Sequence, residues 1–321
     1  MEKFAIIDLG TNTFNLLLLR VDAPQDVSSV RVEHMERHGV RLGEGGINEQ
    51  RILPEASDRA VKTLRYFTEL AEKHGVPDKN IVATGTSAVR NADNRQDFLH
   101  RVNKETGLRI QVLDGQQEAS LIYEGVCQAL SLKEENSMIV DIGGGSVEYI
   151  ICSSRGVLWQ KSIEMGGQRM MELFHRHEPI LPSECRQLEE YFDKMLPELL
   201  EAIACYSPVE LIGSSGTFET LAAIYERKIG YEPDTESRSS FWLPVGQFEL
   251  IHSQLVKNNL EERLIVPGMI PLRAKMIVVA SCLVKYLVKQ MQTDMIRISS
   301  YALKEGVMKR VIEGSGFGNP I

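Results

Sequence analysis

Two stretches of the chain share one pattern of strand, acid, small-residue turn and strand. Residues 4–19 run FAIIDLGTNTFNLLLL, and residues 137–152 run SMIVDIGGGSVEYIIC. When Asp8 is placed on Asp141, the two stretches align over their whole length. Each copy predicts a β-hairpin with an acid at the end of its first strand. The repeat therefore constrains the chain to fold as a duplication.

The second copy carries three consecutive glycines, Gly143, Gly144 and Gly145, followed by Ser146. Glycine is costly beside strands, because it loses more backbone freedom on folding than any other residue. Without side chains in the way, successive N–H groups can point into one concavity, and such a nest binds phosphate above all. A tight hairpin that needs glycine only for its turn is the alternative interpretation.

The first copy has a matching tip, Thr11, Asn12 and Thr13, which is rich in N–H and hydroxyl groups. Two facing tips, each rich in N–H and hydroxyl groups, can bind one phosphate from two sides. The paired tips therefore favour a two-sided phosphate clamp over a purely structural turn. Asp141, at the carboxyl end of its strand, is placed to bind Mg²⁺ directly or through water.

A third turn of small residues lies in VELIGSSGTFETL, between a predicted strand and a predicted helix. It places the N–H groups of Ser215, Gly216 and Thr217 at a helix N-terminus, where anions bind. Gly216 follows Ser215 directly, so the spacing of a GxSxG nucleophile elbow is not met. Neither a Walker loop nor a Rossmann turn fits GGGSVE, which does not open a helix.

Each half continues with a third strand and then alternates helices with strands, which is typical of α/β proteins. Expected elements of the first half are strands 28–37, 80–85 and 108–113 and helices 55–74, 94–107 and 116–130. Expected elements of the second half are strands 156–163, 209–213 and 294–299 and helices 183–205 (kinked at Pro197), 216–228 and 273–291. The prediction is two α/β domains, 1–127 and 128–301, with an interdomain cleft; helix 302–313 is a candidate to complete the first domain.

Bulk properties limit the classes of partner. The chain has 321 residues and a net charge of −8, which argues against general affinity for nucleic acid or anionic membranes. Its five cysteines form no CxxC pair, so reduced thiols are expected. No signal peptide or membrane span is evident from hydropathy, so we expect a soluble cytoplasmic protein.

The motifs together resemble the exopolyphosphatase / guanosine pentaphosphate phosphatase (Ppx/GppA) family, whose fold belongs with actin, Hsp70 and the sugar kinases (ribonuclease H-like). The resemblance is carried, in the family's order, by AIIDLGTNTFNLLL, GVRLGEGG, ATGTSAVRNADN, VLDGQQEASLIYEGV, DIGGGSVEYI, GSSGTFETL and SYALKEGV. The length matches family members that have two domains only.

The resemblance implies a role for each matching residue. Glu118 would be the general base that activates water, and Glu148 a second catalytic acid near that water and the metal. Asp141, with Glu148, would bind Mg²⁺ or another divalent cation, residues 143–146 would hold the terminal phosphate, and Arg90 would clamp phosphate. Arg169, His175, Arg176 and Arg273 are further candidates for lining the path of a polyanion.

The chain departs from the family pattern at two places. The family's EEAR is Gln117, Glu118, Ala119 and Ser120 here, and its RAD is Arg273, Ala274 and Lys275. These differences bear on substrate length and choice more than on the reaction.

The expected function is hydrolysis of a terminal phosphoanhydride, in inorganic polyphosphate or in guanosine pentaphosphate (pppGpp, giving ppGpp). Two alternatives remain open: a kinase of the same fold, and a weakly active or non-enzymatic regulator that binds polyphosphate or ppGpp. The sequence leaves the oligomeric state open, a homodimer included.

Overall fold

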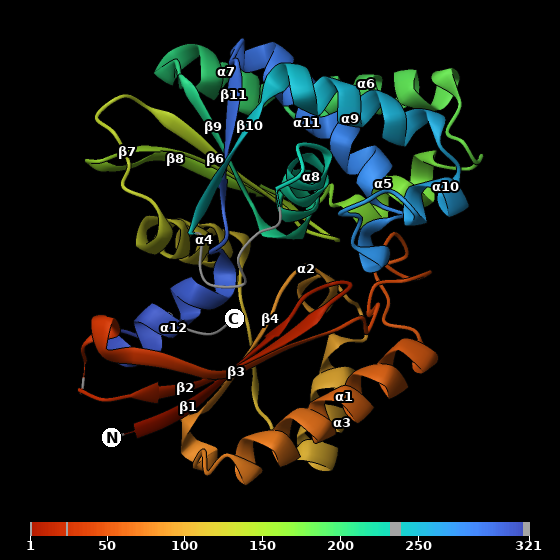
Figure 1. The fold of residues 1–321 in the computed structure, drawn as a ribbon. Coiled ribbons are helices and arrows are strands. Elements are labelled where there is room, and N and C mark those ends of the chain that lie inside the picture. The colour runs from red at the N-terminus through yellow and green to blue at the C-terminus, as the bar shows by residue number, and fades with distance from the viewer. Residues whose placement is uncertain (1, 24, 232–238, 317–321) are drawn as a thin grey trace. The chain divides into compact units, whose positions relative to one another are not determined.

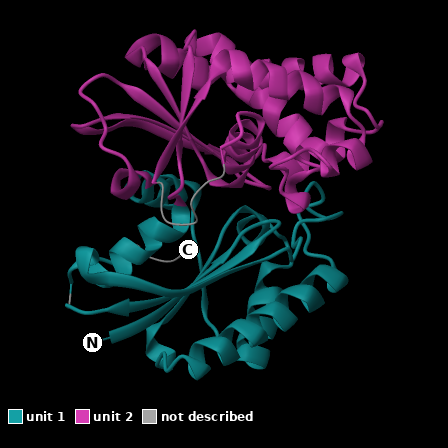
Figure 2. Cartoon of the chain, viewed as in Figure 1, with its two compact units in different colours: residues 1–125, 303–321 teal, residues 126–302 magenta. Residues whose placement is uncertain are grey.

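The computed structural model of the protein describes residues 2–23, 25–231 and 239–316. The chain forms two compact units, shown in teal and magenta in Figure 2. Unit 1 combines Met1–Gly125 with Leu303–Ile321, and unit 2 is Val126–Ala302. None of the helices in the described part of the chain has the length and apolar character needed to cross a membrane.

Unit 1 is built on a five-stranded sheet of order β3-β2-β1-β4-β5 (Figure 1). Strands β1, β2 and β3 pair antiparallel as a meander, whereas β4 and β5 run parallel to β1. Its elements are β1 (Glu2–Leu9), β2 (Phe14–Val21), β3 (Val30–His38), α1 (Pro54–Lys73), β4 (Ile81–Gly85), α2 (Ser87–Arg90), α3 (Arg95–Thr106), β5 (Ile110–Val112), the start of α4 (Gly115–Ala129), and α12 (Leu303–Glu313).

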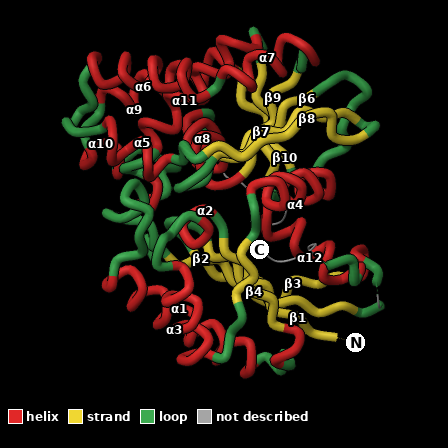
Figure 3. The backbone as a smooth tube through the Cα atoms, turned by 180° about the vertical axis from the view of Figure 1, so that it is seen from behind, coloured by secondary structure: helices red, strands yellow, loops and turns green. Residues whose placement is uncertain are grey.

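Alternation along β1 divides its side chains between the two faces of this sheet. Ala5, Ile7 and Leu9 join one apolar cluster with the buried face of α1, which lies beside α3 (Figures 1 and 3). Helix α12 packs on β1 and β2 and completes unit 1. Helix α1 begins with a proline in its first turn, where the missing N–H costs nothing, and is followed by Gly75 at φ +73°.

Unit 2 contains a six-stranded sheet of order β10-β11-β9-β6-β7-β8. Strands β6, β7 and β8 form an antiparallel meander, β9 and β11 run parallel to β6, and β10 is an antiparallel edge strand. Its elements are β6 (Ser137–Ile142), β7 (Val147–Ser153), β8 (Gly156–Ile163), α5 (Gly167–Phe174), α6 (Pro182–Met195), α7 (Pro197–Tyr206), β9 (Glu210–Ser214), α8 (Ser215–Lys228), β10 (Ser240–Pro244), α9 (Val245–Lys257), α10 (Leu260–Leu264), α11 (Ile277–Met291) and β11 (Met295–Ser299).

Two helix predictions in unit 2 were wrong in detail. The single kinked helix over 183–205 is two helices, because Pro197 occupies the first turn of α7 and cannot donate to the turn before it. The helix expected over 273–291 starts at Ile277, after a short 3₁₀ turn at Pro271–Arg273. Helices α6 and α9 both contact α11 (Figure 3).

The two units repeat one plan, so the predicted duplication is confirmed. In both sheets the order is a three-stranded meander followed by two parallel strands. Asp8 pairs with Asn15 across the first hairpin, and Asp141 pairs with Glu148 across the second. This is the duplicated α/β fold expected from the sequence.

Candidate active site

A row of four polar residues crosses the sheet of unit 2 at the hairpin tip. Strand registers place Ser214 of β9 beside Asp141 of β6, Asp141 beside Glu148 of β7, and Glu148 beside Ser162 of β8. Residues directly opposite each other in a sheet project from the same face. The two carboxylates therefore stand together, each with a serine on its outer side.

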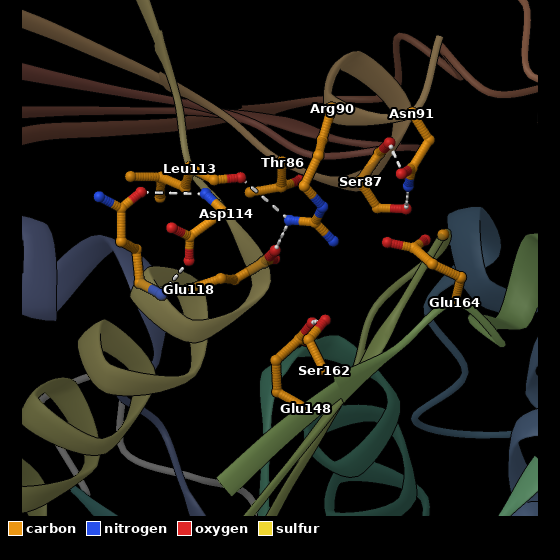
Figure 4. Close-up of polar contacts among 12 residues, drawn as sticks. Thr86, Ser87, Arg90, Asn91, Leu113, Asp114, Glu118, Glu148, Ser162 and Glu164 are labelled. Carbon is orange, nitrogen blue, oxygen red and sulfur yellow. Dashed lines mark hydrogen bonds and ion pairs between the residues drawn. The ribbon is translucent and has the colours of Figure 1, made fainter. Parts of the chain in front are cut away.

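Hydrogen bonds connect each carboxylate of this row to its serine. The Ser214 hydroxyl donates to Oδ2 of Asp141 at 2.8 Å. The Ser162 hydroxyl donates to Oε1 of Glu148 at 2.6 Å, and Figure 4 shows these two side chains. Asp141 and Glu148 are only 6% and 1% exposed. Burial raises the pKa of the Asp141 carboxyl, and hydrogen bonds from Ser214 and Ser215 oppose that rise. A bound cation would offset the cost of burying charge here.

The glycine run forms the tip beside this row. The N–H of Gly143 donates to the carbonyl of Ser146 at 3.1 Å and closes the turn. No hydrogen bond between described residues has the N–H of Gly144, Gly145 or Ser146 as its donor. These three N–H groups are therefore available to an anion.

The third small-residue turn lies next to the row, because Ser214 leads directly into α8. The hydroxyls of Ser215 and Thr217 each lie 3.5 Å from the carbonyl oxygen of Ile142, at the end of β6. Ser215 has φ +64°, an uncommon conformation for a residue with a side chain. A side chain at Gly216 would overlap the guanidinium of Arg273, so this glycine lets a cation lie against the helix N-terminus.

Unit 1 repeats the row with different chemistry. Register places Thr84 beside Asp8, Asp8 beside Asn15, and Asn15 beside Arg37. Asn15 Nδ2 donates to Asp8 Oδ2 at 3.0 Å, and Arg37 Nε donates to Asn15 Oδ1 at 3.2 Å. The second carboxylate of unit 2 is thus an amide here, and the acid pair is specific to unit 2.

The tip of unit 1 holds the three residues expected to bind phosphate. Thr11, Asn12 and Thr13 are all buried, and the tip is closed by a Gly10 N–H bond to the Thr13 carbonyl at 3.1 Å, matching the length in unit 2. The Thr13 hydroxyl has no hydrogen-bond partner among the described residues. It has the capacity to bind a ligand oxygen.

Glu118 and Arg90 meet in unit 1. Arg90 Nη1 lies 2.6 Å from Glu118 Oε2 and also donates to the carbonyl of Leu113 at 3.1 Å (Figure 4). Both side chains are largely buried, 11% and 8% exposed. Arg90 therefore orients the carboxylate predicted to be the base, a contact that the sequence did not suggest.

The start of α4 explains one departure from the family pattern. The Gln117 N–H donates to Asp114 Oδ1 at 2.7 Å, and the Asp114 N–H donates to Gln117 Oε1 at 3.0 Å. This reciprocal pair is a capping box, in which glutamine serves as well as glutamate. Gln117 therefore fixes the helix start and with it the position of Glu118. Ser120, the second departure, donates its hydroxyl to the Gln116 carbonyl at 2.8 Å.

The donor set of unit 2 suits Mg²⁺. This ion is bound by one or two carboxylates and completes its shell with water and substrate phosphate. Asp141 and Glu148 supply two adjacent carboxylates beside the glycine tip. No group of three or more His, Cys, Asp or Glu residues that could hold a metal occurs among the described residues, so an all-protein cage is not offered there.

The other predicted candidates lie in unit 2. Arg169 Nε donates to the carbonyl of Gly145 at 2.9 Å, and its Nη2 lies 3.3 Å from Glu164 Oε2. His175 Nε2 lies 3.5 Å from Glu178 Oε1, and Arg176 is exposed. Sequence reasoning missed Ser162 and Ser214, whose only signal is their place in the strand register.

Comparison with known proteins places the chain in a family. The family model described as the Ppx/GppA phosphatase family matches residues 21–313. Exopolyphosphatase 1 of Mycobacterium leprae is 26% identical over 99% of this chain and 92% of its own length. A bifunctional 3-dehydroquinate synthase/phosphatase of Fusobacterium nucleatum is 26% identical over 97% of this chain, which spans only 46% of that protein.

Among solved structures, an exopolyphosphatase resembles this chain over the whole length of both proteins. The crystal structure of an exopolyphosphatase from Cytophaga hutchinsonii has a TM-score of 0.94 and 40% sequence identity, covering 99% of this chain and 100% of that one. The chain belongs to the Ppx/GppA phosphatase family.

Proposed function

We propose that the protein is an exopolyphosphatase, which releases the terminal phosphate of inorganic polyphosphate by attack of water. The observation that carries the proposal is the pairing of Asp141 with Glu148 beside three N–H groups that no described residue uses. Similarity to proteins described as exopolyphosphatases supports the choice of substrate.

Unit 2 supplies the groups that bind the phosphate. The N–H groups of Gly144, Gly145 and Ser146 donate to its oxygens, as an oxyanion hole does, and stabilise charge that develops in the transition state. The start of α8, with Arg273 against Gly216, adds donors and positive charge for the following phosphate.

Unit 1 supplies the base. Glu118 accepts a proton from the attacking water and thereby raises its nucleophilicity. Arg90 holds one carboxylate oxygen of Glu118, so the carboxylate has a fixed orientation before substrate arrives. The buried Thr11, Asn12 and Thr13 tip binds phosphate oxygens as the second phosphate-binding tip.

Asp141 and Glu148 would hold Mg²⁺, which when bound neutralises charge on the phosphoryl oxygens. Ser214 and Ser162 each donate a hydrogen bond to one carboxylate oxygen and so keep the two side chains oriented. The metal is part of this proposal, together with activity on the 5′-triphosphate end of pppGpp.

Release of free phosphate tests the proposal. The protein is incubated with Mg²⁺ and polyphosphate, pppGpp or ATP, with and without small acceptors. Acceptor-independent release from polyphosphate is expected, and release from pppGpp at a lower or similar rate would extend the substrate class. Phosphate transfer that requires an acceptor would favour a kinase, and binding without any release would favour a regulator.

A matched pair of variants connects that activity to the glycine tip. Gly144→Val is expected to abolish release, because its side chain would fill the anion nest. Gly246→Val is the control, since a side chain at that exposed position of α9 meets nothing within 4 Å. Normal turnover by Gly144→Val would show that the turn is structural only.

A further inference from the structure

All three carbonyl groups of the glycine run accept hydrogen bonds from the start of α5. The N–H of Gly167 donates to the Gly143 carbonyl at 2.8 Å, and the N–H of Gln168 donates to the Gly144 carbonyl at 2.8 Å. The Gly145 carbonyl accepts two bonds, from the N–H of Gly166 at 3.0 Å and from Arg169 Nε at 2.9 Å.

This anchoring decides which way the N–H groups of the tip point. In a planar trans peptide the C=O and the N–H that share a plane point in opposite directions. Because the carbonyls of residues 143–145 point to α5, the N–H groups of Gly144, Gly145 and Ser146 point away from it. The direction of these N–H groups is therefore fixed by the groups at the start of α5 that donate to the carbonyls of residues 143–145.

Two features make this contact specific. A side chain at Gly166 would overlap the backbone of Gly144 and Gly145, so glycine is required for the close approach. Arg169 contributes a side-chain bond and is only 8% exposed. A second nitrogen of its guanidinium, Nη2, lies 3.3 Å from Glu164 Oε2, so two contacts fix the orientation of the planar group.

Unit 1 likewise anchors its own tip through backbone N–H groups. The N–H of Gly43 donates to the Thr11 carbonyl at 3.0 Å, and the N–H of Arg41 donates to the Asn12 carbonyl at 2.8 Å. The arrangement thus occurs twice in the chain, and the arginine side chain in unit 2 is an addition to a shared plan.

We propose that Arg169 is a positioning residue, which holds the Gly145 carbonyl so that the N–H of Ser146 and its neighbours face the phosphate. This inference deepens the proposed function and rests on it for the identity of the substrate. It assigns to Arg169 a contact with the peptide that binds the anion, and no contact with the polyanion itself.

Steady-state kinetics of three variants test the proposal. Arg169→Met removes the donor, and kcat should fall about 10-fold or more, since loss of one oxyanion donor costs about 10²–10³-fold. Arg169→Lys should recover part of the loss, because an ammonium donates to the carbonyl but lacks the planar fork. Arg186→Met, an exposed arginine on α6, is the control. A kcat of Arg169→Met within about two-fold of the control would overturn the proposal.

Amide spectra give a readout that a purely structural role would not change. The protein is labelled with ¹⁵N-glycine and titrated with inorganic phosphate. The Gly144 and Gly145 amide signals should shift in the wild type and in Arg186→Met, and should need about 10-fold more phosphate in Arg169→Met. Equal half-saturation in all three proteins overturns the proposal, as does absence of any shift in the wild type.

The two experiments separate failure of this proposal from failure of the proposed function. If the wild type releases no phosphate from polyphosphate, the function is wrong, whereas the amide titration still decides the role of Arg169. If Arg169→Met does not fold, Arg169→Lys carries the test. For Arg169→Lys, a loss of kcat of roughly three-fold or more, together with a weaker amide response to phosphate, supports the proposal. A wild-type kcat and a wild-type amide response in that variant overturn it.

Discussion

The hydroxyl of Ser162 donates a hydrogen bond of 2.6 Å to Oε1 of Glu148, from the neighbouring strand and in direct register. Glu148 is 1% exposed, so this bond takes the place of one that water would otherwise make. A carboxylate held in this way has one oxygen fixed by a neighbouring strand, so its orientation is set by the sheet.

Removal of this hydroxyl should slow catalysis. Ser162→Ala is expected to lower kcat about 10-fold, because a hydrogen bond to a charged group contributes about 1.5–3 kcal/mol. KM for polyphosphate should change little, since Ser162 supports Glu148 and not the phosphate. Steady-state phosphate release measures both constants, and Ser162→Thr, which retains the hydroxyl, is the control. Equal activity of Ala and Thr variants would show that the bond has no role in the reaction.

The pairing of Arg90 with Glu118 leads to a double-mutant prediction. Glu118→Gln keeps the shape of the side chain but cannot accept a proton, so kcat should fall about 10²–10⁴-fold with polyphosphate binding nearly unchanged. If Arg90 acts through Glu118, Arg90→Met combined with Glu118→Gln should be no slower than Glu118→Gln alone.

Additive losses in that cycle would instead show a separate contact of Arg90 with phosphate, as the family resemblance implies. The measurement is kcat of both single variants and of the double variant, with direct binding of a polyphosphate chain as the check on folding. A Glu118→Gln variant that keeps more than about a tenth of wild-type kcat would place the base elsewhere, with Glu148 as the first replacement.

The carboxylate of Asp141 should control the metal requirement. Asp141→Asn is expected to raise the Mg²⁺ concentration for half-maximal activity about 10-fold or more, and to raise KM for polyphosphate less. Asp294→Asn, an exposed acid in the same unit, is the matched control. Activity is measured over a Mg²⁺ series at saturating substrate. If the Mg²⁺ concentration for half-maximal activity and KM for polyphosphate rise equally, or if neither changes, Asp141 is not a metal ligand.

His252 should make stability depend on pH. It is buried, its Nδ1 lies 2.9 Å from the Ser281 hydroxyl, and burial lowers its pKa to about 4. An unfolded histidine binds its proton near pH 6.5, so between these values the unfolded state binds more protons than the folded state. The free energy of unfolding should therefore fall as pH drops from about 6.5 to about 4, by a total of about 3 kcal/mol from this residue, and be constant above that window.

Urea unfolding from pH 7.5 to 4.5 checks this prediction. The difference between the wild type and His252→Gln isolates the histidine, because all other titrating groups are common to both proteins. The wild type should lose more stability than the variant as the pH falls. Parallel curves would mean that His252 takes up its proton in the folded state at an ordinary pH.

Local patterns were sufficient to predict the framework of the site. The two hairpins follow from alternating apolar strands and glycine-rich or hydroxyl-rich tips. Aligning Asp8 with Asp141 makes Asn15 equivalent to Glu148, and the registers agree, because Asp8 pairs with Asn15 and Asp141 pairs with Glu148. These features depend on neighbours in sequence, and periodicity of apolar residues is the strongest signal of that kind.

Contacts between distant segments were not predictable from the sequence. Ser214 and Ser162 are ordinary serines until the order of the strands places them beside the carboxylates. Strand β10 was missed, because its five residues end in proline and it is defined by pairing with β11, which comes much later in the chain. Arg90 and Glu118 are 28 residues apart, and only the fold shows that they pair.

Helix α12 comes from the last part of the chain, yet it packs on β1 and β2, and Gly306 lies so close to Leu121 that a side chain there would overlap its backbone. Unit 2 is therefore, in chain order, an insertion within unit 1. A ribosome completes all of unit 2 before it has made α12. We therefore expect unit 1, although its synthesis starts first, to be completed after unit 2, because the part of its sheet that α12 covers stays exposed until that helix emerges.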